Sequence, residues 1–523
     1  MSLLSVKNLC LAIGTLEILR NISFNLGKGE VFGVVGESGS GKSMTALALM
    51  GLTPGFAITS GRAELDGTDL INLSEGEMCA LRGNQIAMIF QEPMTALNPV
   101  QTIGDQVAET LIIHKRANRR EARKIAREKL NRVGLPAEQF PLDRYPHELS
   151  GGQRQRVSIA LAIALRPKLL IADEPTTALD VTTQAQILDL LKSLVAEEGM
   201  ALMLITHDLA VVAGIADQVA VMQNGEIVEV GPTAQIFRQM RHPYTRQLFA
   251  ASGHVPARDP QTEDAPLLTV TDAVRTYAMP RSGLFSRPPP FPAVNGVSFT
   301  LNKGENLGLV GESGCGKSTL TRAILGLEPL QGGQISLLGQ PVGPKMPNSL
   351  RSAVQVVFQD PYGSFNPRWK VARLVAEPFH LQPNVPADWH QQVADALVSV
   401  GMVERDMDKY IHEFSGGQRQ RIAIARALIL RPELIVLDEA VSALDVSIRA
   451  QILDLLADLS DRLDLSYLFI SHDLGVVRAI TDRVLVMKDG KIVESGPTGQ
   501  VFTNPQHAYT QQLIAATPRL PDA

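Results

Sequence analysis

The sequence has few cysteines, few aromatic residues and no excess of basic charge. Its 523 residues include three cysteines, Cys10, Cys79 and Cys315, and none of them pair at a metal-ligand spacing. A structural zinc or iron–sulfur site is therefore not expected, and scattered thiols suit a reducing compartment. The formal net charge of -5 offers no electrostatic argument for nucleic acid as a partner, or for an anionic membrane surface.

A membrane span and a secretion signal are not expected either. The charge-free stretch 43–61 contains Pro54, three glycines and several hydroxyl residues, which predict a soluble helix followed by a turn. Residues 1–14 carry a short apolar run without a small-residue cleavage site, so they predict a first β-strand. If the protein serves a membrane, we expect it to do so through partners.

What the sequence does contain is a duplication of whole domains. The stretch GESGSGKS at 36–43 recurs as GESGCGKS at 311–318, and further matched motifs follow each of them. In each copy, apolar runs of strand length alternate with helical patterns, which predicts an α/β fold with a mainly parallel sheet. A polar, proline-bearing stretch separates the copies. The expected ranges are 1–252 for the first domain, 253–266 for the linker and 267–523 for the second domain.

The repeated stretch has the pattern G-x-x-x-x-G-K-[ST], and in both copies it follows a strand and opens a helix. Its glycines let backbone N–H groups curl around phosphate oxygens, its lysine reaches the β- and γ-phosphates, and its last hydroxyl ligates Mg²⁺. We call 36–43 and 311–318 the phosphate loops. The expected binding residues are Gly36, Ser38, Gly39, Gly41, Lys42 and Ser43, and Gly311, Ser313, Gly314, Gly316, Lys317 and Ser318.

An Asp–Glu pair at the end of a later strand supplies the expected hydrolytic chemistry. It reads LLIADEP in the first copy and LIVLDEA in the second. Asp173 and Asp438 are predicted to hold the hydrated metal, and Glu174 and Glu439 to orient and deprotonate an attacking water.

Two further stretches, LSGGQRQRV at 149–157 and FSGGQRQRI at 414–422, each precede a helix. With the phosphate loops they resemble the ATP-binding-cassette (ABC) ATPases over essentially the whole chain. The resemblance implies two P-loop NTPase cassettes in tandem, with ATP and Mg²⁺ as cofactors. Each cassette would have a mainly parallel sheet core, an antiparallel β subdomain and an α-helical subdomain.

The same resemblance implies that two cassettes pack head to tail, so that the signature segment of each faces the phosphate loop of the other. One chain would then supply both cassettes. A serine hydroxyl and glycine amides at a helix N-terminus suit a γ-phosphate. The signature residues expected to bind nucleotide are Ser150, Gly151, Gly152 and Gln153, and Ser415, Gly416, Gly417 and Gln418.

Further roles also come from the resemblance alone. Gln91 and Gln359 are expected to sense metal and water, His207 and His472 to contact the γ-phosphate, and Asp180 and Asp445 to communicate across the dimer. Tyr277 is expected to stack on adenine. Ile13 occupies the matching position of the first copy, which predicts either weaker ATP binding or weaker discrimination between bases at the first site.

The subfamily is indicated by N-P after each glutamine and by HPYTRQLF at 242–249, which is HAYTQQLI at 507–514. These features resemble the dipeptide, oligopeptide and nickel importer branch, and segments 232–252 and 497–520 resemble its C-terminal extension. The resemblance implies an ATPase that powers import of peptides or peptide-like solutes. It would lie peripherally on the cytoplasmic face of the inner membrane, with two transmembrane permease subunits and a solute-binding protein.

Two alternatives are a tandem cassette protein acting on ribosomes and a fused sugar-importer ATPase. The first typically has a long charged linker and the second a degenerate second site, and neither feature is found in this sequence.

Three further expectations concern the helical subdomains, one loop and one cysteine. Segments 94–147 and 362–412 would form the helical subdomains, whose groove receives a permease helix in importers. The proline-rich stretch 279–292 would be a surface loop. Cys315 would either favour its thiolate beside Lys317 or be a small buried side chain.

Overall fold

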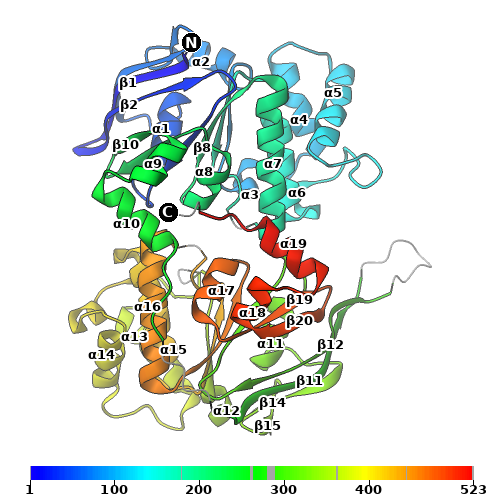
Figure 1. Cartoon of the computed structure of the whole chain (residues 1–523), viewed down its shortest axis with the longest axis vertical. Coiled ribbons are helices and arrows are strands. Elements are labelled where there is room, and N and C mark those ends of the chain that lie inside the picture. Colours follow the sequence, from blue (N-terminus) through cyan, green and yellow to red (C-terminus); the bar gives the residue numbers. More distant parts are fainter. Residues whose placement is uncertain are drawn as a thin grey trace.

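The computed structural model describes residues 2–177, 179–258, 263–279, 289–360, 363–442 and 444–520. Two halves of similar architecture are stacked along the long axis of the molecule, the first running from blue to green and the second from green to red (Figure 1). The described residues of each half build a four-stranded sheet and a six-stranded sheet.

The four-stranded sheets are antiparallel and contain the first two strands of each half. Their strands run in the order β2-β1-β4-β5 and β12-β11-β14-β15. The predicted first strand is confirmed as β1. The strands are β1 (Ser2–Ile13), β2 (Leu16–Gly27), β4 (Ala57–Leu65) and β5 (Thr68–Asp69), then β11 (Pro266–Tyr277), β12 (Phe291–Asn302), β14 (Gly332–Leu337) and β15 (Gln340–Pro341).

The six-stranded sheets are parallel except for one edge strand each, which confirms the predicted fold class. Their orders are β10-β9-β3-β8-β7-β6 and β16-β17-β18-β13-β19-β20, and β10 and β20 are the antiparallel strands. The first has β3 (Val31–Val35), β6 (Ile86–Ile89), β7 (Leu169–Asp173), β8 (Ala201–Ile205), β9 (Gln218–Gln223) and β10 (Glu226–Pro232). The second has β13 (Asn306–Val310), β16 (Val354–Val357), β17 (Leu434–Asp438), β18 (Ser466–Ser471), β19 (Arg483–Lys488) and β20 (Lys491–Pro497).

The central strands β3, β7 and β8 are buried at every position, because helices cover both faces of a parallel sheet. The helices of the first half are α1 (Lys42–Leu49), α2 (Glu75–Leu81), α3 (Pro93–Ala96), α4 (Ile103–Ile113), α5 (Arg119–Arg132), α6 (Gly151–Ala162), α7 (Val181–Glu198), α8 (Leu209–Ile215), α9 (Thr233–Gln239) and α10 (Pro243–Ser252), with the 3-10 turn η1 (Pro146–Glu148). The helix predicted within 43–61 is α1.

The helices of the second half follow the same plan. They are α11 (Lys317–Ile324), α12 (Asn348–Ala353), α13 (Val371–Ala376), α14 (Trp389–Ser399), α15 (Gly416–Leu428), α16 (Val446–Leu463), α17 (Leu474–Ile480), α18 (Thr498–Thr503) and α19 (Ala508–Ala516), with 3-10 turns η2 (Glu377–Leu381), η3 (Glu404–Asp408) and η4 (Ile411–Glu413). In the described part of the chain, no helix is both long enough and apolar enough to cross a membrane.

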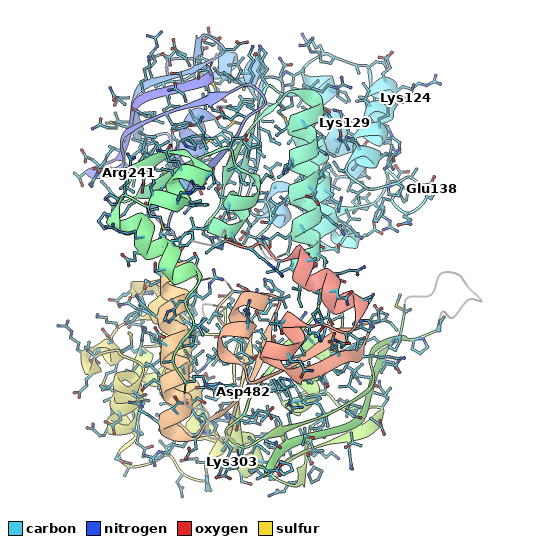
Figure 2. The ribbon with its side chains drawn as sticks, in the orientation of Figure 1. Lys124, Lys129, Glu138, Arg241, Lys303 and Asp482 are labelled. Carbon is cyan, nitrogen blue, oxygen red and sulfur yellow. The ribbon has the colours of Figure 1, made fainter. Side chains whose placement is uncertain are left out.

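A separate helical layer lies beside each six-stranded sheet. In the first half, α4, α5 and α6 pack on one another, and Lys129 of α5 reaches Glu198 at the end of α7 with an N–O distance of 3.8 Å (Figure 2). In the second half, α13 and α14 pack on α15. Helices α4 and α5, and α13 and α14, fall within the segments predicted to be helical subdomains, whereas α6 and α15 follow those segments in the sequence.

The two halves are docked through their C-terminal helices. Helix α10 packs on α16 of the second half, and α19 packs on α7 of the first (Figure 1). Val181 of the first half lies in an apolar cluster with Tyr509 and Leu513, and Leu520 packs on the cluster of the first half that contains Tyr244.

The segment that connects the halves is hydrogen-bonded to the second half. Arg258 donates through Nη1 to the carbonyl of Ile480 and to the Asp482 carboxylate, both at 3.0 Å, and Asp482 is labelled in the lower half of Figure 2. Most of the predicted loop 279–292, residues 280–288, lies outside the described residues. Its predicted end is wrong, because β12 already begins at Phe291, where the chain pairs with Tyr277 of β11.

Replacing Val181 with Asp tests the docking of the halves. The carboxylate would lie among apolar side chains of the second half, and we expect it to weaken docking by about 3 kcal/mol. Faster proteolysis of the linker and a larger radius of gyration in X-ray scattering should follow. Val398→Asp on α14 is the control, because Val398 is 58% exposed. Equal behaviour of the two variants would contradict the docked arrangement.

Candidate active site

Each phosphate loop encloses its own lysine between a strand and a helix. The first loop connects β3 to α1, and Lys42 Nζ donates to the carbonyls of Gly36 and Glu37, both at 2.8 Å. Gly36 has a φ of 154°, and a Cβ there would lie 2.3 Å from the carbonyl oxygen of Met222, so only glycine fits. Burial lowers the pKa of Lys42, and the nearby Glu174 carboxylate opposes that shift.

The second loop repeats this geometry between β13 and α11. Lys317 Nζ donates to the carbonyls of Gly311 and Glu312 at 2.7 and 2.8 Å. A Cβ on Gly311 would lie 2.2 Å from the carbonyl oxygen of Met487. Both loops therefore curl around an ammonium group at the carboxyl end of a central strand, where a phosphate would lie at the N-terminus of the following helix.

A buried carboxylate faces each loop. Asp173 ends β7 and accepts a hydrogen bond from the Ser43 hydroxyl at 3.1 Å. Burial raises the pKa of Asp173 to about 6 against the effect of that bond, and burial likewise raises the pKa of Asp438 at the end of β17. A buried carboxylate beside a serine hydroxyl is a donor set that fits Mg²⁺, which is usually held by one or two protein oxygens together with phosphate.

The glutamate that follows each aspartate has an unusual backbone. Glu174 has a φ of 46° and Glu439 a φ of 52°, in the left-handed region of the backbone that residues other than glycine rarely adopt. Their amides donate to the carbonyls of Ile205 and Ile470, both at 2.8 Å, which holds the turn at the strand end. Such strain costs about 1–3 kcal/mol and is concentrated at functional sites.

Glu174 is the centre of a hydrogen-bond network of predicted site residues. Its carboxylate lies 3.1 Å from His207 Nδ1, and accepts from Gln91 Nε2 at 2.9 Å and from the Thr177 hydroxyl at 2.8 Å. Burial alone would raise the pKa of Glu174, but the contact with His207, the hydrogen bond from Thr177 and the nearby Lys42 together outweigh it, and the pKa lies below its usual value. The same contact raises the pKa of His207 against the effect of burial. At neutral pH Glu174 is therefore a carboxylate, able to accept a proton.

The second half has the corresponding arrangement. His472 Nδ1 lies 3.1 Å from Glu439 Oε1, and this contact together with the nearby Lys317 outweighs burial and lowers the pKa of Glu439. Lys317, Ser318, Gln359, Asp438, Glu439 and His472 line one cavity of about 900 Å³. The structure thus gathers the predicted phosphate-loop residues, Asp–Glu pair, glutamine and histidine of each copy at the carboxyl ends of parallel strands.

Each signature serine begins a helix. Ser150 and Gln153 form a reciprocal cap at the start of α6, with the Gln153 amide donating to the Ser150 hydroxyl at 3.3 Å. Ser415 and Gln418 do the same for α15, at 3.4 Å. A Cβ on Gly152 would meet Thr183 Cγ2 of α7 at 2.5 Å, which explains the glycine there.

Family comparisons agree with this geometry. The family model described as ABC transporter matches residues 19–177 and 294–442. The chain belongs to the ABC transporter family. A second model, described as Oligopeptide/dipeptide transporter, C-terminal region, matches residues 228–271 and 493–523, overlapping the segments predicted to resemble that extension.

Curated relatives are similar over nearly the full chain. The peptidoglycan transport ATP-binding protein YejF of Agrobacterium fabrum is 48% identical over 528 residues, covering 98% of this chain and 96% of that protein. The glutathione import ATP-binding protein GsiA of Escherichia coli K12 is 48% identical over 559 residues, covering 99% of this chain and 90% of that protein. The predicted tandem ABC cassettes that bind and hydrolyse ATP are thereby confirmed.

Contacts across the two cassettes join each phosphate loop to the opposite half. The Ser38 amide donates to Asp445 Oδ1 at 2.7 Å, and the Thr182 hydroxyl donates to Glu312 Oε1 at 2.6 Å. Asp180 of the first cassette also lines the cavity at the second phosphate loop. Neither signature segment contributes a residue to the described lining of this cavity. Contact between the signature segments and nucleotide therefore stays a prediction.

Two kinds of site residue were missed by sequence reasoning. Thr182 contacts the opposite phosphate loop, and the hydroxyls of Tyr244 and Tyr509 accept hydrogen bonds from the amides of Glu37 and Glu312 at 3.1 and 3.0 Å. The recurrence of His-x-Tyr-Thr in both copies was the available signal for the tyrosines.

Tyr277 and Ile13 occupy matching places, at the ends of β11 and β1. The Tyr277 hydroxyl donates to Glu328 at 2.7 Å, and the Arg275 guanidinium lies 5.0 Å from the ring centre. These contacts fix the ring, and its stacking on adenine stays a prediction.

The thiolate predicted at Cys315 is wrong. Cys315 is 8% exposed, and burial raises its pKa even though Lys317 Nζ lies 3.9 Å from the sulfur and acts in the opposite sense. Its Sγ would lie 2.8 Å from a Cβ on Gly311, so the side chain fills space inside the loop.

Thiol labelling tests this correction. A maleimide should modify exposed Cys79 well before Cys315, as followed by mass spectrometry, because a buried neutral thiol reacts slowly. Cys315→Ser should keep ATPase activity within about twofold of the parent, since Ser40 occupies the matching position of the first loop. Labelling of Cys315 before Cys79 would restore the thiolate hypothesis.

Proposed function

We propose that this protein powers the import of peptides or peptide-like solutes through two transmembrane permease subunits. Cargo would be delivered by a solute-binding protein, and the ATPase would lie peripherally on the cytoplasmic face of the membrane. The proposal rests on the oligopeptide/dipeptide transporter C-terminal region. In both halves this region follows the predicted catalytic glutamate and histidine in the sequence. The transport and import proteins named among the relatives support the same assignment.

The proposed chemistry at the first site follows from its contacts. Lys42 and the loop amides would hold the β- and γ-phosphates, and Ser43 and Asp173 would hold Mg²⁺, which supplies positive charge to the phosphate oxygens. Glu174 would take a proton from the attacking water as general base, with Gln91 and His207 orienting its carboxylate.

The second site would use the matching residues of its own half, with Glu439 as base. Each site would be completed by the signature segment of the other half: 415–418 for the first site and 150–153 for the second. The contacts of Asp445 with Ser38 and of Thr182 with Glu312 support this pairing, because they already join each loop to the opposite half.

The surface next to the second site supports a role for a permease segment. The cavity at the second phosphate loop extends from Gln359 to residues of η2, including Glu377, Pro378, His380 and Leu381. A permease helix seated against this region would contact the glutamine that senses metal and water. Binding there could then be relayed to the catalytic glutamate.

Single replacements of the glutamates test the paired sites. Glu174→Gln and Glu439→Gln should each lower steady-state ATP hydrolysis by about 100-fold or more, because each removes a general base and neither site turns over without the other closing. Glu138→Gln, on an exposed residue labelled in Figure 2, should leave the rate unchanged. Turnover retained in either catalytic variant would contradict the proposal.

Reconstitution tests the cargo and the partners. Vesicles containing the chain and two candidate permeases, with ATP and the chain in the lumen, should accumulate a labelled oligopeptide offered outside with its binding protein. The Glu174→Gln/Glu439→Gln double variant should abolish uptake. Accumulation of a sugar instead, or co-sedimentation of the chain with ribosomes rather than co-purification with membrane proteins, would replace this function by one of the two alternatives.

A further inference from the structure

The start of α10 is fixed by a compact set of side-chain hydrogen bonds. The Glu229 carboxylate accepts from the amides of Arg241 and His242 at 3.0 and 3.2 Å, and from the Thr245 hydroxyl at 2.6 Å. His242 Nδ1 accepts from the amide of Tyr244 at 3.2 Å. Arg241 is labelled in Figure 2 beside this helix. The helix start therefore has one defined position relative to β10, on which Glu229 lies.

The start of α19 repeats this arrangement in the second half. The Glu494 carboxylate accepts from the amides of Gln506 and His507 at 2.7 and 3.0 Å, and His507 Nδ1 accepts from the amide of Tyr509 at 3.1 Å. Two copies that differ in sequence around this motif keep the same placement of the tyrosine.

The placed tyrosine reaches the phosphate loop of its own half. Tyr244 is 5% exposed, and its hydroxyl accepts from the Glu37 amide at 3.1 Å; Tyr509 is 3% exposed and accepts from the Glu312 amide at 3.0 Å. Burial raises the pKa of Tyr244 to about 12, so the phenol is neutral at physiological pH.

The peptide held by the tyrosine is also the peptide held by the lysine. The amide of Glu37 and the carbonyl of Gly36 belong to one trans peptide unit, so they point in opposite directions. Tyr244 binds the amide side, and Lys42 Nζ binds the carbonyl side at 2.8 Å. In the second half the unit between Gly311 and Glu312 lies in the same way between Tyr509 and Lys317.

The helix that carries each tyrosine rests on the opposite half. Helix α10 packs on α16, and just beyond it His254 Nε2 lies 2.6 Å from Asp454 Oδ1 of α16. Helix α19 packs on α7, and Tyr509 shares an apolar cluster with Val181. A change in the docking of the halves thus acts on the helix that positions the tyrosine.

We propose that Tyr244 and Tyr509 are positioning residues that set the orientation of the phosphate-loop lysine through the peptide each pair shares. Docking of the halves supports that orientation through α10 and α19. The inference concerns nucleotide binding by the cassette itself, so it stands whether or not the cargo is a peptide.

Nucleotide affinity at one isolated site tests the proposal. In full-length chains carrying Lys317→Ala to silence the second site, Tyr244→Phe should weaken binding of a fluorescent ATP analogue about two- to tenfold, the value of one hydrogen bond. Binding of the matching ADP analogue should weaken less, because ADP lacks the γ-phosphate that the lysine also reaches. Tyr509→Phe in a Lys42→Ala chain should behave likewise.

A double-mutant cycle separates positioning from a merely structural role. In a chain that also carries Lys42→Ala, Tyr244→Phe should cause no further loss of ATP affinity, because the group through which it acts is gone. Tyr467→Phe is the matched control: its buried hydroxyl has no hydrogen-bond partner among the described residues, and its removal should leave ATP affinity unchanged.

A further variant tests how docking of the halves contributes to ATP binding. His254→Ala removes the contact with Asp454, and should weaken ATP binding at the first site in chains with Tyr244 but not in chains with Tyr244→Phe. Unchanged ATP affinity in Tyr244→Phe, or an equal loss with and without Lys42, would overturn the positioning role. An unchanged affinity in His254→Ala would overturn the link to docking.

Discussion

The structure depends on burying one ammonium group beyond the carboxyl end of one central strand in each half, β3 or β13. Lys42 and Lys317 are 5% and 6% exposed, and each donates to two carbonyls of its own loop. A charge in such a place must be hydrogen-bonded and matched by opposite charge. The loop therefore needs glycines so that its carbonyls can point inward, and carboxylates at the ends of neighbouring strands lie close by. A nucleotide phosphate completes the set of partners.

That constraint explains which features could be predicted from sequence. The loops, the Asp–Glu pairs and the capped signature helices are local patterns, and each one occupies a fixed place relative to a strand end. Because the carboxyl ends of parallel strands share one edge of the sheet, residues as distant as Gln91, Glu174 and His207 meet there. The family resemblance identified these residues, and the sheet topology accounts for their proximity.

Other features depend on contacts that no local pattern records. The environment of Cys315 is decided by packing inside the loop, where loss of solvation outweighs the nearby ammonium group. Thr182 reaches Glu312 only because the halves are docked, and Tyr244 meets Glu37 across 207 positions of sequence. The strand start at Phe291 follows from pairing with Tyr277, which favours extending β12 into a proline-rich stretch.

The two halves share catalytic residues but differ where they meet. Asp445 binds the first phosphate loop directly, whereas at the second loop the contact comes from Thr182. Arg449 of α16 pairs with Asp473 at 2.6 Å, and Gln184 occupies the matching position on α7. Burial and the neighbouring Asp473 raise the pKa of Asp208 on the opposite side of this contact, against the effect of Arg449. The two halves thus differ in the contacts that join them, although each carries the same catalytic residue types.

The central claim is that a single chain forms both nucleotide sites head to tail, and distances between spin labels test it most directly. In a chain freed of native cysteines and carrying Glu174→Gln and Glu439→Gln, label pairs are placed at His147/Leu327 and at His412/Leu52. Each pair joins one signature region to the end of the helix that follows the opposite phosphate loop. Both distances should shorten when ATP and Mg²⁺ are added to the monomeric chain. Distances that stay unchanged, or that shorten only when two chains associate, would contradict the account.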